Sequence, residues 1–162
     1  LGPEVRRGPL MGKRRIIAID PGKMTGLSVF TLEEGGEPVL EWSAEVDEDT
    51  FATPLRIEFA NHPELEVVCE RFVITVQTAK NTQAPFSLEL IGVLKQIVRD
   101  NGRPVSSIYF QSPSDVMKLF PNPALKKLGY WHKGGADHAN DSIRHNLAYM
   151  SGNGWMPTRL LD

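Results

Sequence analysis

The stretch that decides the fold is RIIAIDPGKMTGLSVF, residues 15–30. It opens with a β-branched run that ends at Asp20, turns at Pro21 and Gly22, and resumes with strand-forming residues from Thr25. Because β-branched residues favour strands and Pro-Gly pairs favour turns, this pattern predicts a β-hairpin. The carboxylate of Asp20 is expected at the mouth of its first strand.

The rest of the chain predicts a single α/β domain. A third strand is expected at residues 39–46 and a fourth at 65–72, whose nearly continuous apolar run indicates a sheet covered on both faces. A fifth strand is expected at residues 107–111. Helices are expected at residues 51–60, 87–100, 115–120 and 138–150, with prolines at 121 and 123 breaking the chain. Leaving out the short helix at residues 115–120, the predicted order is βββαβαβα, without an internal repeat.

Length and composition support one globular domain of 162 residues, 41% of them hydrophobic. We expect residues 12–162 to form it. Residues 1–11, rich in Gly, Pro and Arg, are expected to be a disordered arm or a cloning remnant. No apolar run is long enough to span a bilayer, so no membrane association is expected.

Cysteine content and charge limit the possible functions further. The only cysteine is Cys69, which excludes an internal disulfide and a cysteine-cluster zinc site and favours a reducing, cytoplasmic location. The net charge of −2 gives no overall basic signal. Nucleic-acid binding would therefore need a local basic patch.

Two acidic residues belong to the predicted apolar strands. Asp20 closes the first strand, and Glu70 follows the apolar run that ends at Cys69. A carboxylate beside a buried strand must be compensated by a counter-charge or a metal ion. The alternatives are that Asp20 merely forms the turn and that Glu70 pairs with Arg71 or another base.

A third group is the segment GGADHAND, residues 134–141, at the start of the last predicted helix. His138 and Asp141 are three residues apart and share a helix face, while Asp137 is placed to cap the helix. His145 continues the same face as a supporting or structural histidine. The alternative is a capped helix whose polar first turn is simply solvated.

Carboxylates from separate elements repel one another unless a divalent cation neutralises them. A set of hard oxygen ligands with one imidazole suits Mg²⁺ or Mn²⁺. A pair of such ions can activate water and stabilise the leaving oxygen in phosphodiester hydrolysis. The residue types therefore point to a metal-dependent endonuclease with two ions in its active site.

Three segments resemble the motifs of RuvC-type Holliday-junction resolvases. They are IIAIDPG (residues 16–22) with the Thr-Gly-Leu of residues 25–27, VVCERF (67–72) and ADHANDSI (136–143), within a match over residues 15–150. The resemblance implies an RNase H-like fold, a five-stranded mixed sheet flanked by helices. It also implies the metal ligands Asp20, Glu70, His138 and Asp141, and the family has Asp or His at the position of His138. Asp137 lies next to this set, as a fifth ligand or as the helix cap.

The same resemblance implies a homodimer that cuts four-way DNA junctions, in a bacterium or a phage-infected host. The residues placed to contact branched DNA are Phe72, Lys80, Lys118, Lys126, Lys127 and Lys133. Phe72 would stack on an unpaired base, and the lysines would bind phosphates. The alternatives are that Phe72 belongs to the core and that the lysines only cover the surface.

Three other functions compete with junction cleavage. An RNase H-like nuclease acting on flaps, forks or hybrids would use the same metal site, and the fold cannot settle the substrate. An actin-like ATPase also begins with a strand, Asp, Gly and Thr-Gly, but it needs two such domains and a glycine-rich adenosine site, neither of which the sequence indicates. A binding module without catalysis is disfavoured because Asp20, Glu70 and Asp141 are all present.

Overall fold

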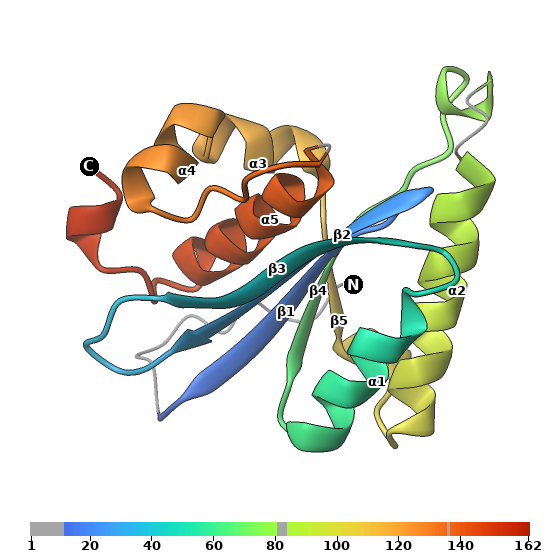
Figure 1. Cartoon of the computed structure of the whole chain (residues 1–162), viewed down its shortest axis with the longest axis horizontal. Helices are drawn as coiled ribbons and strands as arrows, with labels where there is room; N and C mark the ends of the chain where they lie inside the picture. The colour runs from blue at the N-terminus through green and yellow to red at the C-terminus, as the bar shows by residue number, and fades with distance from the viewer. Residues whose placement is uncertain (1–11, 81–83, 136) are drawn as a thin grey trace.

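The computed structural model describes residues 12–80, 84–135 and 137–162, so the predicted arm at residues 1–11 lies outside the described residues. The fold is built on one five-stranded sheet with the order β3-β2-β1-β4-β5 (Figure 1). The strands are β1 (Arg14–Asp20), β2 (Met24–Leu32), β3 (Val39–Asp47), β4 (Glu66–Glu70) and β5 (Ile108–Gln111). The first three form an antiparallel meander, and β4 and β5 run parallel to β1. The predicted mixed sheet is confirmed.

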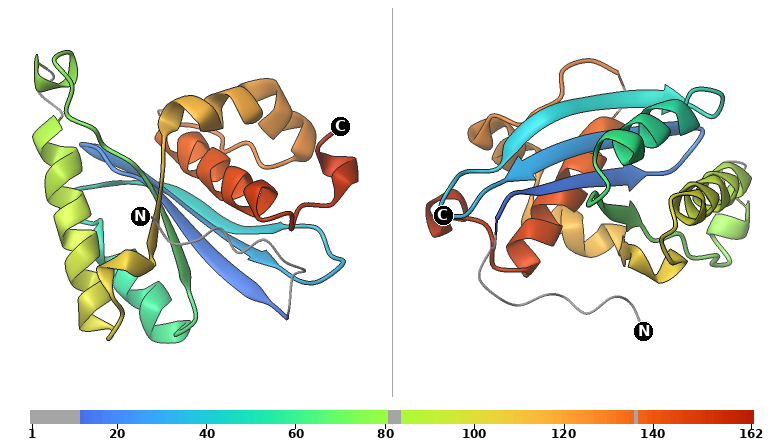
Figure 2. Two further views of the ribbon diagram at one scale, coloured as in Figure 1. Left: turned by 180° about the vertical axis from the view of Figure 1, so that it is seen from behind. Right: turned by 90° about the horizontal axis from the view of Figure 1, so that it is seen from below.

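Helices cover both faces of the sheet, as Figures 1 and 2 show. One face carries α1 (Ala52–Asn61) and α2 (Ala84–Asp100), and the other carries α3 (Pro113–Leu119), α4 (Asn122–Leu128) and α5 (His138–Gly152). Short 3₁₀ turns lie at Thr78–Lys80, Val105–Ser107 and Thr158–Leu160. Within the described residues, no helix combines the length and the apolar character needed to cross a membrane.

The alternation of side chains along β1 creates two cores. Ile17 and Ile19 face α1 and α2, whereas Ile16 and Ala18 face the layer of α5. All four side chains are fully buried. The central strand is therefore held on both faces, which fixes the position of Asp20 at its end.

The structure corrects the sequence prediction at several boundaries. Strand β4 ends at Glu70, two residues early, and α5 continues to Gly152. Helix α4 was not predicted, because Pro121 before it and Pro123 within it were interpreted as chain breaks. Pro123 instead lies in the first turn of α4, where the backbone N–H has no helical partner to lose, and Gly129 ends the helix with φ of 82°.

Candidate metal centre

Asp20 and Glu70 end neighbouring parallel strands at the same edge of the sheet. The register pairs Ile19 with Cys69. Asp20 and Glu70 are the next residues of the two strands, so they lie beside each other in space. The turn after Asp20 is closed by Thr25, whose hydroxyl donates to the carbonyl oxygen of Gly22 at 3.1 Å. Strand pairing alone therefore brings together two residues that are distant in sequence.

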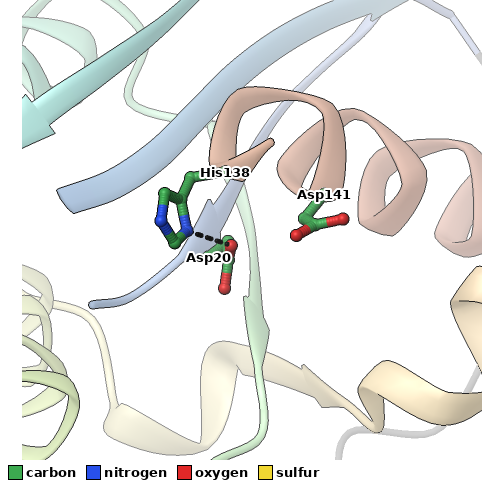
Figure 3. Close-up of side chains that lie close together, drawn as sticks. All are labelled: Asp20, His138 and Asp141. Atoms are coloured by element: carbon green, nitrogen blue, oxygen red, sulfur yellow. Dashed lines mark hydrogen bonds and ion pairs between the residues drawn. The ribbon is translucent and has the colours of Figure 1, made fainter. Parts of the chain in front are cut away.

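Helix α5 brings the other predicted ligands to this edge. One ligand atom each of Asp20, His138 and Asp141 lies within 4.8 Å of the others, and Figure 3 shows Asp141 on α5 beside the facing pair of Asp20 and His138. Nδ1 of His138 is 3.2 Å from Oδ2 of Asp20. We call these three residues the acidic cluster.

The carboxyl groups of the acidic cluster are partly buried and lie close to one another, with too little positive charge beside them. Burial above all, helped by the charges of Glu70 and Asp141, raises the pKa of Asp20 to about 7 against the opposing hydrogen bond from His138. Burial also raises the pKa of Asp141. The hydrogen bond to Asp20 raises the pKa of His138. A divalent cation would supply the missing charge, so these residues fit a metal ion.

Glu70 lies outside the acidic cluster but close enough for its charge to act on it. Its side chain is one-quarter exposed, and its Oε2 is 3.0 Å from Nε2 of His145. His145 thus supports Glu70 from α5, in line with the supporting role considered for it from the sequence. The counter-group of Glu70 is this buried imidazole.

The N-terminus of α5 differs from the sequence prediction. Asp137 occupies the N-cap position, but its side chain makes no capping hydrogen bond, so the predicted side-chain cap is wrong. Its backbone carbonyl accepts from the N–H of Asp141 at 2.9 Å. Glu45 of β3 reaches the helix start instead, accepting from the N–H of Ala139 at 3.4 Å. Glu45 could not be found from sequence, because no local pattern links residues that meet only through the folded sheet.

Arg144 is a second residue that the sequence analysis missed. This fully buried side chain pairs with Asp141, and its Nε donates to the carbonyl oxygen of Phe120 at 2.8 Å. It also donates to the side chain of Asn122 at the start of α4. The charge of Arg144 lowers the pKa of Asp141, against the effect of burial. No signal in the sequence pointed to it, because α5 is buried around almost its whole circumference and its burial pattern marks no single inner face.

The predicted DNA-contacting lysines are all exposed, on α3, on α4 and in the segments around Thr78–Lys80 and before α5. Nζ of Lys126 lies 4.7 Å from the centre of the Trp131 ring. Phe72 is half-buried and packs against the core on the side of α1 and α2. The lysines are therefore available to a ligand, whereas part of Phe72 serves the core.

No protein-family model matches the sequence, and no curated protein is significantly similar to it. Solved structures of RuvC from Thermus thermophilus are similar in fold. The structure of T. thermophilus RuvC in complex with a Holliday junction substrate superposes with a TM-score of 0.64 at 16% identity, covering 85% of this chain and 94% of that one. Another T. thermophilus RuvC structure gives a TM-score of 0.62 at 17% identity, covering 87% and 97%. This chain therefore has the RuvC-like, RNase H-like fold.

Proposed function

We propose that this protein is a metal-dependent endonuclease that hydrolyses phosphodiester bonds in branched DNA, with four-way junctions as its main substrate. The observation that carries the proposal is the acidic cluster of Asp20, His138 and Asp141, with Glu70 beside it, at the carboxyl edge of a RuvC-like sheet. In such folds, ligands bind where the parallel strands end. The T. thermophilus protein of the same fold binds a Holliday junction.

Each residue of the site has a distinct part in this proposal. Asp20 is the most buried ligand, and the charges of Glu70 and Asp141 both act on it, so these carboxylates and His138 would together hold two cations. Bound Mg²⁺ or Mn²⁺ would supply Lewis acidity for phosphodiester hydrolysis. Asp137 is exposed beside His138 and is a further candidate ligand.

The DNA path and the assembly follow from the same proposal. The exposed side chains of Lys118, Lys126, Lys127 and Lys133 would bind phosphates near α3 and α4, and Lys80 and Phe72 would contact DNA from the segment that follows Glu70. Leu88 and Val93 expose apolar surface on α2, and these residues are 45% and 38% exposed. We propose that the exposed side of α2 pairs two copies, so that two strands are cut symmetrically. Light scattering of the junction complex should then give two copies per junction.

The test is cleavage of matched four-way, three-way, flap, fork, hybrid and linear duplex substrates in Mg²⁺, in Mn²⁺ and in EDTA. We expect metal-dependent cuts in the four-way junction, symmetric about its centre, and little cutting of the linear duplex. Preferential cutting of flaps, forks or hybrids would agree with the proposed metal site but contradict four-way junctions as the main substrate. No cutting of any substrate would refute the nuclease.

A matched acidic variant controls for contaminating nuclease and for general effects of charge. Glu34 is exposed in the β2–β3 turn, at the end of the sheet opposite to Asp20, because Arg14 pairs with Leu32 there. Glu34→Gln should cut like the wild type. Asp20→Asn, prepared identically, should not.

A further inference from the structure

His145 is a fully buried histidine whose two ring nitrogens both have partners. Nε2 lies 3.0 Å from Oε2 of Glu70, and Nδ1 lies 2.8 Å from the side-chain amide of Gln111 on β5. The histidine therefore bridges α5 to the ends of two neighbouring strands, β4 and β5. It does not belong to the acidic cluster.

The amide of Gln111 decides which ring nitrogen carries the proton. With its NH₂ group facing the ring, Gln111 donates to Nδ1 at 2.8 Å and to the carbonyl oxygen of His145 at 3.0 Å, and its oxygen accepts from the N–H of Tyr149 at 3.2 Å. All three contacts are then satisfied, which the opposite orientation does not achieve. Nδ1 is therefore an acceptor, and the neutral ring carries its hydrogen on Nε2, aimed at Glu70.

Glu70 needs such support because its own strand ends with it. The chain leaves β4 at Arg71, and the following residues from 73 to 77 are exposed. A glutamate side chain has three rotatable bonds, and holding it in one rotamer costs conformational entropy. A donor fixed in the core can hold one oxygen of Glu70 and leave the other for a cation.

We propose that His145 is a positioning residue, set in one tautomer by Gln111, that holds Glu70 in place as a ligand for a divalent cation. The inference rests on the proposed function, in which Glu70 binds the metal. Groups that hydrogen-bond to metal ligands commonly change metal affinity by about 10–100-fold when they are removed. His145 would thus act on the metal through Glu70 without touching the metal itself.

The test compares two replacements of similar length in the DNA-free protein. His145→Gln can place an amide N–H where Nε2 stands, whereas His145→Met cannot donate. We expect the Kd for Mn²⁺, from the free-ion signal in electron paramagnetic resonance, to rise about tenfold or more in His145→Met and less than about threefold in His145→Gln. His62→Met changes a half-exposed histidine after α1 and should leave the Kd unchanged.

Thermal unfolding in EDTA identifies any variant that fails to fold. If His145→Met is one, Gln111→Leu replaces it, because the ring then loses the donor that sets its tautomer and the Kd for Mn²⁺ should rise. Equal Kd values in the Met and Gln variants, or an unchanged Kd in Gln111→Leu, would overturn the role of His145. Mn²⁺ binding by a wild type that cuts no DNA would refute the proposed function alone, and absence of Mn²⁺ binding would refute both.

Discussion

The backbone of Gly26 lies directly against the backbone of His138, so that a Cβ at position 26 would overlap the carbonyl oxygen of His138. Gly26 pairs with Asp20 across the β1–β2 ladder. The missing side chain of one residue therefore lets α5 begin beside Asp20. This close approach brings His138 and Asp141 to the strand end.

Gly26→Ala should consequently displace the start of α5. We expect a loss of about 1–3 kcal/mol in the free energy of unfolding, from overpacking against main chain. The cleavage rate should fall roughly 100-fold, because reacting groups tolerate little misplacement. Gly152→Ala, at the other end of α5, is the control, since nothing lies within 4 Å of a Cβ built there. It should fold and cleave like the wild type, because alanine is tolerated at least as well as glycine in a helix. Wild-type cleavage by Gly26→Ala would show that the close approach is dispensable.

Asp20 should destabilise the metal-free protein at neutral pH. Its pKa is raised to about 7 in the folded state, so the folded protein holds a proton that the unfolded chain has already released. Stability in EDTA should therefore fall as the pH rises from about 4 to about 7. Asp20→Asn should remove this loss and be more stable than the wild type at pH 8 by roughly 2–4 kcal/mol. Denaturant unfolding of the wild type and Asp20→Asn at pH 5 and pH 8 measures this difference in the free energy of unfolding.

Glu58 gives the opposite sign and serves as the internal control for that experiment. Arg15 donates to both of its oxygens, at 2.8 and 2.9 Å, and these bonds lower the pKa of Glu58 despite its burial. Its contribution is present above the ordinary pKa of a glutamate and is lost as the pH falls through the lowered value. Glu58→Gln should therefore lose stability at pH 8. If Asp20→Asn also loses stability at pH 8 in EDTA, the electrostatic account of the cluster is wrong.

Much of the candidate site could be predicted from the sequence because its signals are local. Asp20 and Glu70 end apolar strands, and His138 and Asp141 lie on one face of the first turn of a helix. Glu45 and Arg144 belong to no such local pattern. Glu45 reaches α5 only because β3 pairs with β2, and Arg144 is buried only because α3 and α4 close over it. Partners of this kind depend on tertiary packing, which periodicity and spacing do not record.

His138 should make metal binding sensitive to acid. An imidazole binds metal only when it is neutral, and the hydrogen bond to Asp20 raises the pKa of His138 above its ordinary value. Mn²⁺ affinity should therefore fall as the pH drops through that raised value. His138→Asp should keep cleavage and reduce the preference for Mn²⁺ over Mg²⁺. Part of the acid loss should remain in it, because Asp20, whose pKa is about 7, also takes up a proton in that range. His138→Ala should lose most of the activity, and normal cleavage by it with both metals would remove His138 from the site.

The lysines should reveal the DNA path through the salt dependence of binding. Replacing Lys118, Lys126, Lys127 or Lys133 by alanine should weaken junction binding and lower the salt slope by roughly one for each lost phosphate contact. Lys13 lies before β1, at the end of that strand opposite to Asp20, beside Glu33. Lys13→Ala should leave the slope unchanged. Unchanged salt slopes in all four test variants would show that these lysines are solvated surface residues that do not contact DNA.

The central claim is that the carboxylates bind the cations that cleavage requires and do not themselves bind the DNA. The most direct measurement is single-turnover cleavage of a four-way junction in Mg²⁺, with each protein at a concentration that saturates the junction. Asp20→Asn, Glu70→Gln and Asp141→Asn should bind the junction about as well as the wild type, because each keeps the basic surface. They should cut it at least about 100-fold more slowly, because each removes ligand charge. Wild-type cleavage rates in all three variants would contradict the account.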